Sequence, residues 1–345
     1  ADAVFILLRK ARAMKRSLLA SCLLMCMTHT YAMTLKIATL SPDGSAWMVK
    51  MRAGAAEIET RTQKRVAFKF YTGGTMGNDR AVLNKIKIGQ LQGGAVTAGS
   101  LADFYKDAQI YAMPLLFKSF AEVDYVRQKF DPMLSKGLEQ GGMVNFGFAE
   151  AGFAYAMSKT APIPSVAELR KHRVWIPEND IQSAETLKAF QVSPIPLSLA
   201  DVLPSLQTGI IDTVASSPIG TLALQWHTQV KYLTDLPLSY IIGVLAIEQI
   251  AFNKIEPADQ AVVREVMQRV FKEIDAQNRQ DNVAAYNSLL KQGIKAVKPN
   301  DKELVDWEKA GAAASERIEK AGVVNATTWK SLQDYLKTFK ANAKS

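Results

Sequence analysis

The sequence predicts an α/β protein built from two lobes, and three observations support this fold class. Two series of short apolar strands and amphipathic helices alternate along the chain. A long helical pattern follows them and continues almost to the end. The length of 345 residues corresponds to about two domains, and a composition of 48% hydrophobic and 22% charged residues is typical of a globular protein.

The first 32 residues are predicted to be a leader and a secretory signal peptide. Residues 14–16 provide a basic segment, residues 17–27 form an apolar run, and small residues stand three and one positions before the cleavage site expected after Ala32. The apolar run is too short to span a membrane, because a membrane-spanning helix needs about 20 residues. Residues 1–13 precede Met14, where we expect translation to start. The mature chain is therefore expected in the periplasm.

The leader and signal peptide account for part of the basic character of the chain. Together they hold five basic residues and one acidic residue, so their removal lowers the formal net charge from +9 to +5. Both cysteines, Cys22 and Cys26, are removed with them, which leaves no thiol for a disulfide. The remaining basic residues are scattered and lack interleaved aromatic residues, so we expect no nucleic-acid partner.

The first series of elements forms a predicted β-α-β-α-β unit. Apolar runs and apolar–polar alternation predict strands at 35–38, 66–70 and 93–98, and apolar residues at helical spacing predict helices at 46–59 and 78–88. The glycines between the second strand and the second helix predict a tight turn. They lack the G-x-G-x-x-G and G-K-S/T patterns of phosphate-binding loops.

The second series begins near residue 146 and repeats this alternation without repeating the sequence. Strands are predicted at 173–176, 192–196 and 211–215, and helices at 181–190 and 199–207. The two series therefore predict two α/β lobes.

The last part of the chain is predicted to be helical, beginning at Pro257, a residue favoured in the first helical turn. A helix from Pro257 to Gln292 would span roughly 54 Å at 1.5 Å per residue. That length is sufficient to brace both lobes.

The mature chain offers few residues for catalysis or metal binding. Its two histidines, His172 and His227, do not stand at metal-ligand spacing, and we expect His172 to lie in a solvated basic turn. The mature chain has no cysteine nucleophile and no G-x-S-x-G motif. We therefore expect no enzyme, no cofactor and no metal. Ligands of two-lobed α/β proteins bind between the lobes and at strand ends, so these observations favour a periplasmic solute-binding protein.

Two other functions stay open at this point. A binding protein can serve a membrane sensor instead of a transporter, and the sequence of the receptor does not separate the two. An exported two-lobed enzyme would need an acid, a base and a nucleophile in one geometry, and no motif indicates such a set.

Five stretches, in order along the chain, resemble the extracytoplasmic solute receptors of TRAP transporters, the DctP-type family. They are residues 70–79 (FYTGGTMGND), 88–91 with 94–96 (IGQL, GAV), 113–117 (MPLLF), 206–212 (LQTGIID) and 255–260 (IEPADQ). The resemblance implies a fold like that of periplasmic binding proteins, with two lobes, segments that cross between them and a long bracing C-terminal helix. It also implies a small organic solute, often a carboxylate, which is delivered to a sodium-coupled TRAP permease of two membrane subunits.

The predicted lobes are assembled from separate parts of the chain. Lobe I is expected to comprise residues 33–154 and about 246–284, and lobe II residues 155–245 and about 285–345. We expect a monomer rather than a dimer.

The ligand-binding arginines of the family are missing from the matching positions. Residues 171–180 match the stretch that usually holds an arginine, and Trp175 takes its place when the two stretches are aligned on Pro177. A second family arginine matches Ala154, and a family asparagine matches Ser217. We therefore hypothesise that this chain does not hold its solute by the usual bidentate arginine–carboxylate pair.

Aromatic, hydroxyl and carboxylate side chains are the candidate ligand-binding residues in place of that pair. Trp175 would offer an aromatic wall or a cation-attracting face, with a core aromatic in a strand as the alternative. Acidic side chains would favour a cationic or hydroxyl-rich solute, although Glu178 and Asp180 also fit a capping turn. The complete candidate set is Trp175, Glu178, Asp180, Glu150, Ser217, Ser216, Ser100, Trp47, Trp226 and Tyr240.

Overall fold

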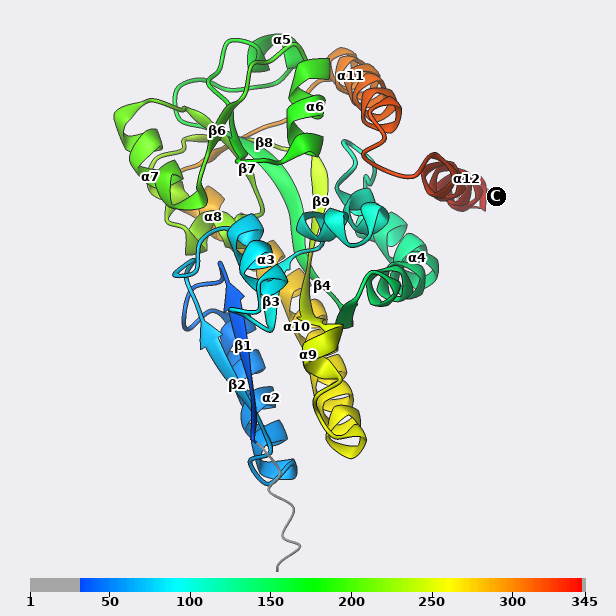
Figure 1. The fold of residues 1–345 in the computed structure, drawn as a ribbon. Helices are drawn as coiled ribbons and strands as arrows, with labels where there is room; N and C mark the ends of the chain where they lie inside the picture. The colour runs from blue at the N-terminus through cyan, green and yellow to red at the C-terminus, as the bar shows by residue number, and fades with distance from the viewer. Residues whose placement is uncertain (1–31, 343–345) are drawn as a thin grey trace, which may run out of the picture.

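The computed structural model describes residues 32–342 of the chain. The predicted leader and signal peptide lie outside the described residues, except for Ala32. Among the helices of the described part, none combines the length and the apolar character needed to cross a membrane. Figure 1 shows two lobes, one above the other, with strands and a long helix that pass between them.

Eight strands form one mixed sheet in the order β10-β8-β4-β9-β3-β1-β2, with β7 also paired to β4. Two further strands, β5 and β6, form a separate parallel pair. The bounds of the strands are β1 Met33–Thr39, β2 Val66–Tyr71, β3 Gly93–Thr97, β4 Met143–Ser158, β5 Trp175–Pro177, β6 Ile195–Leu197, β7 Thr213–Ser216, β8 Tyr232–Thr234, β9 Ser239–Glu248 and β10 Lys295–Val297.

The helices cover this sheet and extend the lobes on both sides (Figure 1). Their bounds are α2 Ala46–Arg61, α3 Asp79–Lys87, the 3₁₀ helices η1 Ala98–Asp103 and η2 Lys106–Ala112, α4 Phe120–Gln140, α5 Val166–Leu169, α6 Ile181–Ala189, α7 Leu199–Thr208, α8 Pro218–Ala223, the 3₁₀ helix η3 Trp226–Thr228, α9 Gln249–Phe252, α10 Pro257–Lys291, α11 Asp301–Lys320 and α12 Ala326–Asn342.

The first helices begin at residues that can accept hydrogen bonds from unpaired backbone N–H groups. The Oγ of Ser45 accepts from the backbone N–H of Met48 at the start of α2, and the Oδ1 of Asn78 accepts from that of Ala81 at the start of α3. These caps fix where each helix starts after its strand. The predicted β-α-β-α-β unit is observed as β1, α2, β2, α3 and β3.

Strand β4 belongs to both lobes. Its first part pairs antiparallel with β9 as far as Ala154, and from Tyr155 onwards it pairs with β7. The pairing with β9 is irregular near Gly147 and Gly152, and both glycines have positive φ angles, of 94° and 107°. A positive φ is readily adopted by glycine alone, so these two residues permit the bends of the crossing strand.

Helix α10 spans both lobes beside β4 (Figure 1). Its 35 residues correspond to about 52 Å of helix. The first half buries apolar side chains from Val263 to Ile274, and the same face continues with the buried polar residues Asn278 and Asn282. The predicted two-lobed fold with a long bracing helix is confirmed.

The last helix packs on the first lobe. Trp329 and Leu332 of α12 lie in the same hydrophobic cluster as Val126 of α4, and the rings of Tyr125 and Tyr335 stack at 4.2 Å. The chain therefore returns from α11 to the side of α4, although the expected boundary assigned residues 285–345 to the second lobe.

A glycine of β9 accommodates a tryptophan of α2. A Cβ atom at Gly243 would lie 2.5 Å from the indole of Trp47, and that indole also makes an edge contact with Phe271 of α10 at 5.6 Å. The absence of a side chain at Gly243 therefore lets α2 approach the sheet.

The Gly243→Ala variant should be destabilised by about 2 kcal/mol, because the added methyl group would overlap the half-buried Trp47 ring. Urea unfolding followed by tryptophan fluorescence measures this change. Gly99→Ala is the control, since its Cβ would meet its nearest neighbour, Gln109, at an acceptable 3.4 Å. Equal stability of the two variants would contradict the close approach of Trp47 to β9.

Candidate functional site

Two of the predicted serines lie at the junction between β7 and α8. The Oγ of Ser217 accepts a hydrogen bond from the N–H of Gly220 at 3.2 Å and caps α8, and the Oγ of Ser216 donates to the carbonyl of Ser217 at 3.2 Å. Both residues are buried. They stand at the carboxyl end of a strand, which is where α/β proteins bind ligands.

Trp175 and Trp226 form one aromatic pair in the second lobe. Their rings meet edge to face at 5.2 Å, and the side chains are almost fully buried. The Nε1–H of Trp175 donates to the carbonyl of Leu197 at 3.0 Å, which ties β5 to the end of β6. The N–H group of the Trp175 indole is thus already used within the protein.

Four further candidate ligand-binding residues are spread over both lobes. Ser100 follows β3 and donates through its Oγ to the carbonyl of Thr97 at 2.7 Å, and Trp47 is half-buried against β9. Glu178 is exposed, and Asp180 caps α6 by accepting from the N–H of Ser183 at 2.9 Å. The capping alternative therefore describes Asp180, and nothing in these contacts assigns a role to Glu178.

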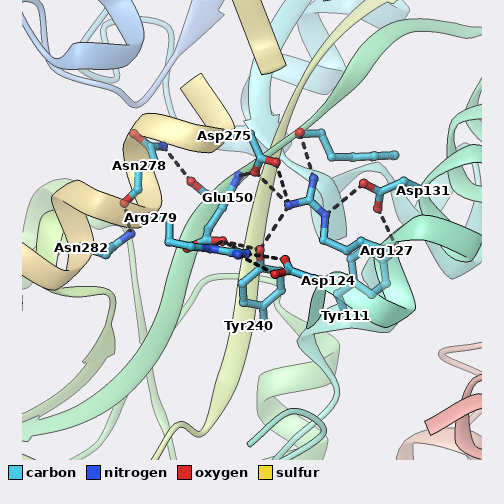
Figure 2. A network of polar contacts seen from close by, with 11 residues as sticks. Tyr111, Asp124, Arg127, Asp131, Glu150, Tyr240, Asp275, Asn278, Arg279 and Asn282 are labelled. Carbon is cyan, nitrogen blue, oxygen red and sulfur yellow. Dashed lines mark hydrogen bonds and ion pairs between the residues drawn. The ribbon is translucent and has the colours of Figure 1, made fainter. Parts of the chain in front are cut away.

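Glu150 and Tyr240 are brought together in a buried polar network (Figure 2). Glu150 is fully buried, and its Oε2 accepts hydrogen bonds from the Tyr240 hydroxyl at 2.9 Å and from Nε and Nη2 of Arg279 at 3.0 and 2.8 Å. Arg279 also donates to Asp124 at 2.8 Å and lies over the ring of Phe120. The second oxygen of Glu150, Oε1, has no hydrogen-bond partner among the described residues.

A second arginine joins this network from α4. Arg127 donates to Asp131 at 2.9 Å and to both carboxylate oxygens of Asp275 at 2.8 and 3.0 Å, and the hydroxyl of Tyr111 donates to Asp131 at 2.7 Å. Burial raises the pKa of Tyr111 and of Tyr240 above the usual phenol value, and it raises the pKa of Asp131 although Arg127 opposes this effect. Both tyrosines therefore act as neutral hydrogen-bond donors.

The network supplies hydrogen bonds to the edge of β4 that faces away from β9. The carbonyl of Phe148 accepts from Arg127 at 3.1 Å, and the N–H of Glu150 donates to Asp275 at 2.7 Å. The carbonyls of Glu150 and Ala151 accept from Asn278 and Asn282 at 2.7 and 3.0 Å. Side chains of α4 and α10 thus take the place of a neighbouring strand.

The sequence contains one signal for this network, although Arg279, Asn278 and Asn282 were not among the predicted site residues. Asn278 and Asn282 follow Ile274 at intervals of four residues, so they continue the buried face of α10. Polar side chains at buried helix positions need hydrogen-bond partners. Such a pattern predicts a polar contact with a neighbouring element, but it does not identify that element.

The expected solvated turn around His172 is wrong. The ring is buried, with Nδ1 at 3.1 Å from Oδ1 of Asp212 and 3.0 Å from Oγ1 of Thr213, and the N–H of Arg173 donates to the same Asp212 oxygen. The charged residues next to His172 in the sequence predict an exposed segment. The imidazole nevertheless points into the protein, where it contacts the buried carboxylate of Asp212. Burial acts to raise the pKa of Asp212, yet hydrogen bonds from His172, Thr213 and Arg173 outweigh it and the pKa is lowered.

Neither a metal cluster nor a hollow lined by the predicted residues stands out within the described part of the chain. No group of His, Cys, Asp or Glu residues in residues 32–342 could hold a metal ion. One hollow of about 460 Å³ lies between α4 and α12, and another of about 520 Å³ lies between α6 and α11. Neither is lined by a predicted ligand-binding residue.

Comparison with known proteins defines the class of this chain. Residues 37–321 match the family described as bacterial extracellular solute-binding protein, family 7, and the chain belongs to this family. The sequence is 22% identical over 246 residues to the sialic acid-binding periplasmic protein SiaP of Vibrio cholerae, covering 69% of this chain and 74% of that relative. It is 24% identical over 212 residues to the uncharacterized protein YiiZ of Salmonella typhimurium, covering 60% of this chain and 64% of YiiZ, which is less than two thirds of that relative.

Solved structures share the fold at low sequence identity. A TRAP periplasmic solute-binding protein of Ralstonia eutropha with bound (S)-2-acetolactate has a TM-score of 0.80 at 17% identity and covers 88% of this chain and 99% of that chain. DctP7 of Bordetella pertussis, a receptor binding pyroglutamic acid, has a TM-score of 0.79 at 18% identity and covers 89% of this chain and 100% of that chain. The fold class and the family resemblance predicted from the sequence are confirmed.

Arg279→Ala should destabilise the protein by about 3 kcal/mol, because it leaves the fully buried Glu150 carboxylate without its cation. Arg52→Ala is the matched control, since the ion pair of Arg52 with Asp43 is largely exposed and its loss should cost less than about 1 kcal/mol. Urea unfolding of both variants measures the difference. Similar losses in the two variants would contradict the buried network.

The contribution of Asp212 to stability should depend on acid pH. Because its pKa is lower in the folded protein than in the unfolded chain, the contribution is complete above the usual carboxyl value of about 3.9 and is lost as the pH falls through the folded-state pKa. The stability difference between the wild type and Asp212→Asn should therefore shrink between pH 7 and about pH 3. Urea unfolding at both pH values tests this, and a difference that stays constant or grows would contradict the assigned hydrogen bonds.

Proposed function

We propose that this chain is the solute receptor of a TRAP-type transporter, which captures a small organic solute between its lobes in the periplasm and delivers it to the membrane permease. Membership of the extracellular solute-binding family supports this function, as does the fold shared with TRAP receptors. The predicted signal peptide supports the periplasmic location. In this proposal the chain is a monomer and performs no catalysis.

The proposed solute site is built from residues at strand ends of the two lobes. Ser100 follows β3 in the first lobe, and in the second lobe Ser216 ends β7 and Ser217 caps α8. Trp47 adds a half-buried indole beside the crossing strand β9. Hydroxyl groups and an aromatic face of this kind bind the hydroxyl groups and the C–H faces of an organic molecule.

The hypothesis that two family arginines are replaced supports the proposed ligand class. In the motif alignment Trp175 stands at one arginine position and Ala154 at the other. Three arginines are already paired within the protein: Arg127 and Arg279 with carboxylates of the network, and Arg173 with Asp212. We therefore propose a solute held through hydroxyl groups and aromatic contacts, without a bidentate guanidinium pair.

Calorimetric titration with succinate tests this ligand class. We expect a dissociation constant weaker than about 1 mM, corresponding to less than about 4 kcal/mol of binding free energy, because the two matching positions supply no guanidinium for the carboxylate. The small molecule that leaves the protein on denaturation, identified by mass spectrometry, should carry several hydroxyl groups. Its binding should weaken in Trp47→Ala, which removes the half-buried indole of the proposed site, and stay unchanged in Trp329→Phe, which alters a buried indole of α12. Tight succinate binding would contradict the proposal.

A further inference from the structure

Asn282 of α10 contacts three segments of the chain at once. Its Nδ2 donates to the carbonyl of Ala151 in β4 at 3.0 Å and to the carbonyl of Asn278 at 3.1 Å. Its Oδ1 accepts from the backbone N–H of Ile219 in α8 at 3.3 Å. The residue is 5% exposed, so its side-chain hydrogen bonds compete little with bulk water. Figure 2 shows it beside Asn278 on the side of α10 that faces the network.

The contact with β4 falls where the strand passes from one lobe to the other. Gly152 follows Ala151 and has a φ of 107°, and a Cβ atom there would lie 2.5 Å from the Nδ2 of Asn282. Between Ala154 and Tyr155, β4 exchanges its partner β9 for β7. The side-chain amide of Asn282 therefore packs directly on the backbone of Gly152, where β4 crosses between the lobes.

The contact with α8 falls beside the proposed solute site. Ile219 is two residues beyond Ser217, which caps the same helix. The first turn of a helix leaves N–H groups without intrahelical partners, and here Ser217 satisfies that of Gly220 while Asn282 satisfies that of Ile219. The orientation of α8, and with it that of Ser216 and Ser217, is thus tied to α10.

We propose that Asn282 is a positioning residue, which joins the start of α8 to the crossing point of β4 at Gly152 and so fixes the solute-binding end of the second lobe relative to the first. The inference rests on the proposed function for its link to solute capture, but the joint itself is defined by the contacts of one amide. Asparagine fits this place because one side chain offers an acceptor at one atom and two donors at another. An apolar residue would leave the N–H of Ile219 and the carbonyl of Ala151 without partners.

Asn278 provides a matched control for a purely structural contribution. It lies one turn earlier on the same face of α10, is equally buried, and donates to the neighbouring carbonyl of β4, that of Glu150, at 2.7 Å. Its side-chain hydrogen bonds among the described residues do not include α8. Asn278→Ala therefore removes support from β4 without touching the joint to α8.

The experiment compares Asn282→Ala with Asn278→Ala in the full mature chain, without added solute. Hydrogen exchange should be about tenfold faster at the amide of Ile219 in Asn282→Ala than in the wild type, which corresponds to one lost hydrogen bond. Small-angle scattering should give this variant a larger radius of gyration, because the lobes lose a fixed connection. Asn278→Ala should resemble the wild type in both measurements, even where its unfolding free energy falls.

Asn282→Ser keeps the test decisive if Asn282→Ala does not fold. The serine hydroxyl can still bond the carbonyl four residues earlier but is too short to replace the acceptor for Ile219, so both effects should remain. If Asn282→Ala or Asn282→Ser matches Asn278→Ala in exchange and in scattering, the positioning role is overturned. Both measurements are made without solute, so they decide this inference even if the chain proves to bind no solute, which would overturn the proposed function alone.

Discussion

A strand edge without a neighbouring strand is the constraint on which the rest of this structure depends. Buried backbone N–H and C=O groups need hydrogen-bond partners, and leaving one unpaired costs about 1–3 kcal/mol. Between Phe148 and Ala151, the edge of β4 that faces away from β9 obtains its partners from side chains of α4 and α10. Both helices must therefore lie beside residues 148–151 of β4. This position determines how the two lobes are joined.

Sequence patterns could predict the elements of the first lobe because those elements are local. The spacing of Met48, Met51 and Ile58 predicts α2, and Ser45 and Asn78 mark the helix starts. Sequence patterns did not predict β4, because a strand that is buried on both faces lacks the alternation of apolar and polar residues. The pairing of β4 with β9 joins residues about a hundred positions apart, which no local pattern reports.

The residue types of the candidate site could be predicted from the sequence, but the direction in which each side chain points could not. The motifs predict that Trp175 and Ala154 stand where the family has arginines, and no local pattern could show that the Trp175 indole is buried and donates to Leu197. Glu150 and Tyr240 were predicted as ligand-binding residues, and the structure shows their polar atoms bonded to one another and to Arg279. The direction of a side chain is determined by what packs around it, and Arg279 lies 129 residues after Glu150 in the chain.

The most direct test of this account is the hydrogen-exchange rate of the Glu150 amide in the intact mature chain. That N–H group donates to Asp275 and not to a strand. If side chains of α4 and α10 hold the edge of β4, the amide exchanges only through global unfolding, with the same opening free energy as the central amides of β9. Exchange at the rate of a solvent-exposed loop amide would show that the edge is open, and would contradict the account of how the lobes are joined.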